Sequence, residues 1–256
     1  MPDPTLHDSP AEPVAPHPVL HGHYEDPGDR EQLLQDLFDS TADHYDWLNH
    51  ILSFGSGNLY RGFALRRAGL EAGMQVADVA CGTGVISERA AQIVGDPALV
   101  VSVDPSAGMR ERARRIRGIL ARPGTAEDLP LEDNSVDFLV MGYALRHVRT
   151  LPECFSEFRR VLKPGGRLLV LEITSPRSRL GRSLSRFYLG RLLPTLGEMV
   201  SRDPRVRQLW DYHWDSIEQC VPPETILAAL AEAGFEHPDR FVQLGLFSEY
   251  RGTCPG

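Results

Sequence analysis

The 256-residue sequence lacks long hydrophobic runs: none comes near the roughly eighteen consecutive apolar residues that a membrane-spanning helix needs. Cysteine is scarce, and Cys81, Cys154, Cys220 and Cys254 show neither C-x-x-C pairs nor metal-ligand spacing, which disfavours a disulfide scaffold and a structural zinc site. The chain has no excess of positive charge: its formal net charge is −8. This acidic balance disfavours a nucleic-acid binder. The N-terminus has no basic start or apolar core typical of a secretory signal. We therefore expect a protein of the reducing cytoplasm.

Residues 1–28 contain many Pro, His and Asp residues and almost no large apolar ones. This composition buries too little apolar surface to offset the entropy of ordering, so it predicts a disordered tail. His17, His21 and His23 are interleaved with Pro and Gly, without a supporting carboxylate arrangement, and metal binding there is not favoured. We expect residues 29–256 to form one α/β domain.

Residues 76–84 (VADVACGTG) combine a short apolar run, an acid at Asp78 and the turn Gly82-Thr83-Gly84, and a helical pattern follows over residues 86–94. This order predicts a buried strand, a tight turn and a helix N-terminus. The glycines permit positive φ angles and close approach of a ligand, and the helix start offers unpaired N–H groups. A lone G-x-G fits both a nucleotide-type site and an ordinary strand–helix turn.

A second apolar run, residues 99–103 (LVVSV), ends in Asp104, twenty-two residues after Gly82. In a doubly wound sheet an acid at this position binds ribose hydroxyls. Asp104 followed by Pro105 also fits a helix N-cap, and one residue can serve both purposes. Because Ser87 stands where a dinucleotide signature has its third glycine, we expect a mononucleoside-like ligand rather than a nicotinamide or flavin cofactor.

Strand and helix patterns alternate through the rest of the chain. Further helices are predicted over residues 106–120, 152–162 and 223–233. Buried strands are predicted over residues 136–141 and 168–173, with two short ones near residues 241–244 and 246–251. This alternation predicts a mostly parallel sheet with helices on both faces and a ligand site outside the carboxyl ends of its strands. Two aromatic-rich helices before residue 76 either cover that site or simply pack on the sheet.

A basic segment, residues 176–194, stands apart from this pattern. It carries five arginines and no acid: Arg177, Arg179, Arg182, Arg186 and Arg191. Leu180, Leu184 and Phe187 recur at helical spacing, so we expect a basic helical insert. Such a helix can contact anionic lipid at a membrane surface. The alternative is a solvated arginine face over an apolar stripe that packs in the core.

Four motifs together resemble the class I S-adenosylmethionine-dependent methyltransferases: VADVACGTG, SVDPS, GTAEDLPLEDNSVDFLV and EFRRVLKPGGRLLVLEI. Further segments resemble the ubiquinone/menaquinone-biosynthesis C-methyltransferase family: FDSTADHYDWLNHILSFG, LRRAGL, YALRHV, LEITSP and PETILAALAEAGF. The resemblance covers roughly residues 33–252. It implies a Rossmann-like doubly wound, mostly parallel seven-stranded sheet with an N-terminal helical cover.

The resemblance also implies S-adenosylmethionine as the cofactor, bound at the ends of the first two strands. The residues assigned to its site are Asp78, Gly82, Thr83, Gly84, Asp104, Thr125, Ala126 and Gly142. The glycine turn would line the methionine and ribose side, Asp104 would hold the ribose hydroxyls, and the backbone near Thr125 would meet the adenine. The family usually has Asn or Asp in place of Thr125 and commonly serine in place of Gly142.

Methyl transfer to an aromatic carbon needs in-line geometry and an electron-rich ring. An ordinary phenol has a pKa of about 10, so a base or a cation is expected near the hydroxyl of a quinol acceptor. The resemblance assigns the catalytic positions to Tyr45, Arg146 and His147, the last replacing the usual Asn. Arg146 cannot readily accept a proton, so it would stabilise phenolate charge or orient a water. His147 is either the general base or its assistant, or only a surface or capping residue.

These observations favour a methyltransferase acting on a ring carbon of a prenylated quinol precursor in quinone biosynthesis. Two alternatives remain: an O- or C-methyltransferase that tailors another aromatic or polyketide-like metabolite, and an inactive partner subunit with the same fold. The expected partner is a small aromatic molecule and not a nucleic acid. A peripheral contact with the inner membrane face through residues 177–191 and a homodimer are both left open.

Overall fold

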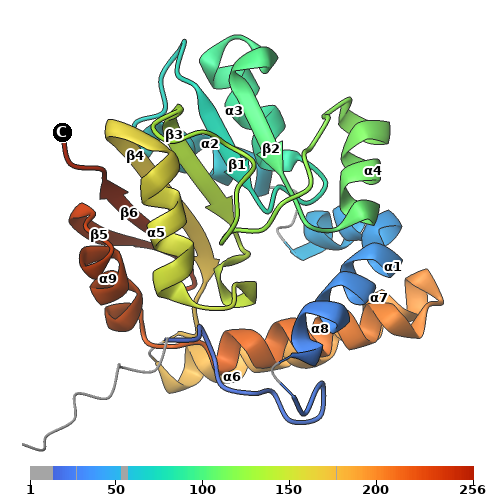
Figure 1. The fold of residues 1–256 in the computed structure, drawn as a ribbon. Helices are drawn as coiled ribbons and strands as arrows, with labels where there is room; N and C mark the ends of the chain where they lie inside the picture. Colours follow the sequence, from blue (N-terminus) through green and yellow to red (C-terminus); the bar gives the residue numbers. More distant parts are fainter. Residues whose placement is uncertain (1–13, 27, 53–56, 177) are drawn as a thin grey trace, which may run out of the picture.

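A twisted sheet runs through the centre of the molecule (Figure 1). The computed structural model describes residues 14–26, 28–52, 57–176 and 178–256, with only the backbone for residues 43–52. The described strands, in spatial order, are β2 (Val100–Val103), β1 (Val76–Val79), β3 (Val136–Gly142), β4 (Leu162–Ile173), β6 (Phe247–Thr253) and β5 (Glu236–Gln243). The first four run parallel, and β6 lies antiparallel to both β4 and β5. The predicted doubly wound, mostly parallel sheet is confirmed.

Helices cover both faces of this sheet, which explains why its central strands are continuous apolar runs. Helices α2 (Gly57–Arg67) and α3 (Val85–Val94) pack on one face, and α5 (Leu151–Val161) and α9 (Pro223–Glu232) pack on the other. All four residues of β1 are buried between these layers. The strand order reverses beside β1, because the chain passes from β1 to β2 on one side and to β3 on the other. A ligand site is expected at the carboxyl ends of strands at such a point.

The sheet has six strands within the described residues, not the seven expected. The edge position beside β2 is occupied by a single parallel bridge between Val103 and Arg122. Two backbone hydrogen bonds hold it, from Arg122 N to the Ser102 carbonyl and from Asp104 N to the Arg122 carbonyl. Pro123 and Gly124 follow immediately, and both residue types are disfavoured in strands, so the pairing stops there.

A layer of helices lies beyond the carboxyl ends of the parallel strands (Figure 1). It consists of α1 (Asp29–Leu52), α6 (Arg179–Phe187), the π-helical turn η3 (Tyr188–Leu192), α7 (Leu193–Ser201) and α8 (Pro204–Glu218). Helix α4 (Ala107–Arg117) lies against α1, and two short 3-10 turns are η1 (Pro97–Leu99) and η2 (Leu145–His147). Among the described helices none is long and apolar enough to cross a membrane.

Residues 14–26 are packed against this helical layer, although the sequence composition predicted a disordered tail up to residue 28. Leu20 and Tyr24 are buried in a cluster with Leu37 of α1 and Tyr212 of α8. Backbone hydrogen bonds join the segment to the domain, from Leu151 N to the Val14 carbonyl and from Val221 N to the Pro16 carbonyl. The few apolar residues of the segment suffice because an apolar surface of the domain receives them.

Candidate functional site

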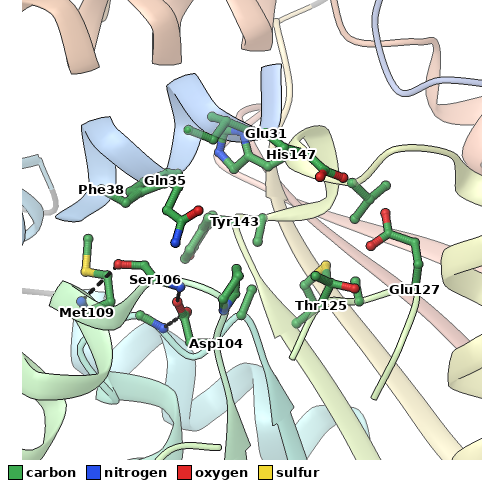
Figure 2. A pocket seen from close by; sticks show the side chains of 18 of the residues that line it. Glu31, Gln35, Phe38, Asp104, Ser106, Met109, Thr125, Glu127, Tyr143 and His147 are labelled. Carbon is green, nitrogen blue, oxygen red and sulfur yellow. Dashed lines mark hydrogen bonds between the residues drawn. The ribbon is translucent and has the colours of Figure 1, made fainter. Parts of the chain in front are cut away.

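A pocket of about 250 Å³ opens at the carboxyl ends of β1, β2 and β3, where the strand order reverses (Figure 2). Its floor comes from the strand ends and the loops that follow them, and α1 forms the opposite wall. Helix α1 is held over the floor by Asp39, whose Oδ1 accepts hydrogen bonds from Ser106 Oγ (2.5 Å) and Gly108 N (2.9 Å) at the start of α4. Of the two helices expected before β1, α1 therefore walls the pocket as a cover, whereas α2 packs on the sheet.

The glycine turn after β1 brings the backbone directly to this pocket. Ala80 and Gly82 line it, both with positive φ angles of 54° and 55°. A Cβ placed on Gly82 meets nothing within 4 Å, so the backbone there borders open space. Thr83 and Gly84 do not line the pocket: Thr83 is buried, and a Cβ on Gly84 would overlap Ile119. Gly84 thus serves the close packing of the turn, and Gly82 is the glycine of the turn that faces the pocket.

Asp104 lies at the end of β2 on the pocket floor and is only 5% exposed. Its Oδ2 accepts a hydrogen bond from Gly82 N (2.7 Å), and its Oδ1 accepts one from Ser106 N (2.9 Å). Burial raises the pKa of Asp104 to about 6, although these two N–H groups and the cation of Arg110 favour the charged form. Each carboxylate oxygen retains a lone pair for a hydroxyl donor.

Asp78 lies in the middle of β1, is fully buried and does not line the pocket. Its Oδ2 accepts a hydrogen bond from Ser87 Oγ (2.6 Å), and Ser87 Oγ accepts one from Ser102 Oγ (2.8 Å). Its Oδ1 has no hydrogen-bond partner in the described part of the chain. Burial, together with the neighbouring Asp104, raises the pKa of Asp78 to about 7. The carboxyl group therefore ties β1 to the first turn of α3 and, through Ser87, to Ser102 of β2.

The remaining residues assigned to the cofactor, Thr125, Ala126 and Gly142, all line the pocket. Gly142 ends β3, where a Cβ would overlap the Cδ1 atom of Ile86 from α3. The residue after Ala126 also faces the pocket: Glu127 Oε1 accepts a hydrogen bond from Arg149 N (2.6 Å).

Several pocket residues were not predicted from the sequence. Gln35 and Phe38 project from α1, Met109 from α4, and Tyr143 follows β3 (Figure 2). Tyr143 has a φ of 62°, a strained value for an aromatic residue and one that clusters at functional sites. The guanidinium of Arg61 lies 5.2 Å from the centre of its ring. Tyr143 directly follows Gly142 at the end of a predicted strand, and this position is the sequence signal that could have identified it.

His147 lines the pocket from η2, within a set of aromatic rings. Its ring centre lies 5.5 Å from that of Phe38, and its Nδ1 lies 3.4 Å from the hydroxyl oxygen of Tyr212. Its Nε2 is buried without a hydrogen-bond partner among the described residues. Burial lowers the pKa of His147 well below 6.5, and the adjacent cation of Arg146 lowers it further. The imidazole is therefore neutral near pH 7 and a weaker base than an ordinary histidine.

Arg146 is directed away from the pocket, into the protein. Its guanidinium forms an ion pair with Glu172 (2.6 Å) and donates to Ser216 Oγ (3.2 Å), and it lies 3.3 Å from Nδ1 of His213. The buried carboxylate of Glu172 at the end of β4 requires a cationic partner, which accounts for this orientation. The expected direct action of Arg146 on an acceptor oxygen does not agree with this placement.

Tyr45, the third expected catalytic residue, belongs to α1, but its side chain lies outside the described residues.

The pocket floor fits the adenosyl part of S-adenosylmethionine. Gly82 offers bare backbone beside open space, and a side chain there would occupy that space. Asp104 offers a carboxylate already fixed by two N–H groups. Bare backbone and a fixed carboxylate are the features that nucleoside sites of doubly wound sheets share.

Comparisons with known proteins agree with this fit. The sequence profile described as the ubiE/COQ5 methyltransferase family matches residues 27–245. The "Ubiquinone/menaquinone biosynthesis C-methyltransferase UbiE" of Shewanella sp. (strain ANA-3) is 33% identical over 217 residues, which are 82% of this chain and 85% of the relative. The protein of the same name from Shewanella oneidensis is 32% identical over the same shares.

Solved structures share the fold. A SAM-dependent methyltransferase from Thermotoga maritima, described as a possible histamine N-methyltransferase, has a TM-score of 0.59 and 22% identity, covering 86% of this chain and 98% of that one. Phosphoethanolamine N-methyltransferase 2 of Haemonchus contortus, solved with S-adenosyl-L-methionine, has a TM-score of 0.59 and 18% identity, covering 85% of this chain and 57% of that one.

Proposed function

This chain belongs to the ubiE/COQ5 methyltransferase family, and from that membership we propose that it methylates a ring carbon of a prenylated quinol precursor. The chain is an S-adenosylmethionine-dependent methyltransferase. The observation that carries the finer proposal is the composition of one pocket: a nucleoside-type floor at Gly82 and Asp104 continues into a wall of aromatic side chains at Phe38 and Tyr143. A flat aromatic acceptor fits against such a wall.

The residues of the floor hold the cofactor, which supplies an electrophilic methyl group when bound. Asp104 accepts hydrogen bonds from the ribose hydroxyls through its free lone pairs, and Gly82 lets the backbone approach the ligand. Thr125 and Ala126 lie at the side of the floor assigned to the adenine. Because methyl transfer depends on in-line alignment, fixing the cofactor on rigid strand ends is a main contribution of the protein.

His147 is the side chain best placed to receive a hydroxyl of the acceptor. Its Nε2 is a buried atom without a partner on a residue that lines the pocket, and the neutral ring can present a lone pair there when Nδ1 carries the proton. A hydrogen bond from the quinol hydroxyl to Nε2 increases the electron density on the aromatic ring of the quinol. The low pKa of His147 makes complete proton transfer unfavourable, so we assign it the role of hydrogen-bond acceptor and orienting group.

Arg146 acts through its neighbours. It joins Glu172 of β4 to Ser216 of α8, and its carbonyl accepts a hydrogen bond from Arg30 of α1 (2.8 Å). These contacts fix η2 and hence the ring of His147 beside it. We therefore assign Arg146 the role of a positioning residue.

We also propose that the protein works at the cytoplasmic face of a membrane. A prenylated acceptor has its tail in the bilayer, and the basic segment over residues 177–191 is the part of the chain suited to anionic lipid.

An assay with radiolabelled S-adenosylmethionine and a short-chain demethylmenaquinol, under reducing conditions, tests the proposal. We expect label in the quinol, and much less label with Asp104→Asn at the same cofactor concentration, because that variant should bind the cofactor more weakly. If cofactor binds without transfer to any quinol, but another aromatic metabolite accepts the methyl group, the tailoring alternative replaces this one. The differences at Thr125, Gly142 and His147 from the usual family residues are what favour that alternative. Failure to bind cofactor would indicate an inactive subunit.

A further inference from the structure

One helical segment, residues 179–201, carries features that methyl transfer does not explain. It consists of α6, the π-helical turn η3 and α7, which follow one another without a break. A π-helical turn inserts one extra residue into a helix and often marks a functional site. Here it lies in the middle of the segment, at residues 188–192.

An apolar stripe runs along the exposed side of this segment. Its members, all exposed except the half-exposed Leu196, are Leu180, Leu184, Phe187, Leu192, Leu196 and Met199. Leu180 is 72% exposed, Leu184 60% and Phe187 58%, and no residue of α6 is buried. The exposure of these side chains excludes the alternative of a stripe packed in the core. Large apolar side chains gathered on one exposed face indicate an interaction surface.

The π-helical turn keeps the stripe in line. Successive members are separated by four, three, five, four and three residues. In a regular α-helix a step of five turns a side chain by about 140° away from its predecessor, which would interrupt the stripe. The five-residue step, from Phe187 to Leu192, falls on the π turn, whose one extra residue lets a step of five take the place of a step of four. The two halves therefore present one continuous face.

The other side of the segment is fixed to the domain. Leu189 and Leu193 are buried against Trp210 and Trp214 of α8. A Cβ on Gly190 would lie 3.1 Å from the indole ring of Trp214, so the helix backbone lies close to that ring. This packing holds the exposed stripe outward on a rigid support.

The charge beside the stripe is of one sign. Arg179, Arg182, Arg186 and Arg191 are all exposed, and the sequence has no acid from residue 174 to residue 197. Arg186 contacts Glu218 of α8, and the other three have no ion pair among the described residues. This basic region lies on a chain whose net charge is −8. A positive patch on an acidic protein indicates an anionic partner rather than a general property of the surface.

We propose that the Leu180–Met199 stripe and its flanking arginines form a docking face for an anionic lipid bilayer. The apolar side chains enter the boundary between headgroups and acyl chains, and the guanidinium groups bind lipid phosphates. A second copy of the chain is a poorer occupant, because a two-fold contact through this face would bring the same arginines against each other. The face rests on exposure and charge, independently of which acceptor is methylated.

Flotation of the purified full-length chain with vesicles tests this face. We expect binding to vesicles of phosphatidylcholine and phosphatidylglycerol, and little binding to phosphatidylcholine alone. The variants Leu184→Gln/Phe187→Gln in α6 and Met199→Gln in α7 should each lower the partition coefficient, the double variant by about tenfold or more. Arg182→Gln/Arg191→Gln should lower binding to the anionic vesicles only. Leu120→Gln, at another apolar side chain that is 78% exposed, is the matched control and should bind as the wild type does.

Turnover of a water-soluble acceptor without vesicles, and the elution volume in gel filtration, complete the test. The variants should keep wild-type turnover there, which separates this face from the proposed function. Vesicle binding unchanged in both stripe variants would overturn the proposal. Loss confined to the α6 variant would contradict the continuous face, and variants that only convert a dimer to a monomer would assign the stripe to a second copy.

Discussion

Asp104 carries opposing demands within one side chain. In its proposed role it is ionised and accepts two hydroxyl donors, yet burial raises its pKa to about 6. A carboxyl whose pKa is raised on folding contributes stability below its unfolded value of 3.8, and this contribution is lost as the pH rises through about 6. The ionised form needed for the ligand is thus obtained at the expense of stability.

Cofactor affinity should therefore depend on pH. We expect the affinity for S-adenosylhomocysteine, measured by calorimetry, to fall as the pH drops below about 6, by at most about tenfold per pH unit for one proton. Asp104→Asn should bind more weakly and lose this dependence. Asp78 has a pKa of about 7, so Asp78→Asn identifies its share. A wild-type affinity constant from pH 7 to pH 5 would contradict the assigned role of Asp104.

The contribution of His147 to stability depends on pH in the opposite direction to that of Asp104. Its pKa is lowered on folding, so its contribution to stability is present above pH 6.5 and is lost as the pH falls below that value. His147→Asn should therefore show a weaker loss of unfolding free energy between pH 6.5 and pH 5, by up to about 1.4 kcal/mol per pH unit. Urea unfolding at several pH values measures it.

The same variant separates the two roles of His147 in catalysis. If His147 accepts a hydrogen bond from the quinol hydroxyl, the substitution should lower kcat by about tenfold to a hundredfold. Because the native imidazole remains neutral, the pH–rate profile of the wild type should show no step at pH 6.5. Full turnover in His147→Asn with an unchanged profile would leave His147 a structural residue only.

At the scale of secondary-structure elements, the sequence predicts those helices and strands that a local pattern of apolar residues marks. The apolar runs over residues 76–79, 100–103 and 136–142 were identifiable as buried strands because both faces are covered. Helix α8 was missed, although Val206, Trp210 and Ile217 are spaced as one buried helix face. The burial of Leu20 and Tyr24 could not be predicted, because it depends on an apolar surface formed by distant segments.

The residues of the site also fall into two groups: those predicted from local motifs and those placed by contacts between distant segments. Gly82 and Asp104 lie in motifs with fixed spacing, and both line the pocket. The orientation of Arg146 depends on Glu172, which is distant in the sequence and reaches it only through the pairing of β3 with β4. Side chains of α1 such as Phe38 enter the pocket through tertiary packing, which no local pattern encodes.

The junction of β3 and α3 gives a prediction at this scale. Gly142 stands where serine is common in the family, and the Cδ1 atom of Ile86 fills the space that a Cβ would need. We expect Gly142→Ser to lower the unfolding free energy by about 1–3 kcal/mol through overpacking. Ile86→Val, which removes that methyl group, should restore most of the loss in the double variant. Equal losses in the single and double variants, by urea unfolding, would contradict this packing.

At the scale of the whole molecule, one helical layer serves two surfaces. On its inner side α1 walls the pocket, and Arg30 of α1 and Ser216 of α8 bind Arg146. On its outer side the segment α6–η3–α7 carries the apolar stripe and the arginines. Both sides meet in α8, which packs on α1 and on α7. The layer thus links the proposed membrane face to the pocket proposed for the prenylated acceptor.

The position of the transferred methyl group tests the proposed ring-carbon methylation most directly. Isotope-labelled S-adenosylmethionine, a short-chain demethylmenaquinol and the full-length chain are incubated under reducing conditions, and the product is analysed by nuclear magnetic resonance. We expect a methyl group bonded to a ring carbon beside a hydroxyl. A methyl group bonded to oxygen, or no labelled quinol from protein that binds the cofactor, would contradict it.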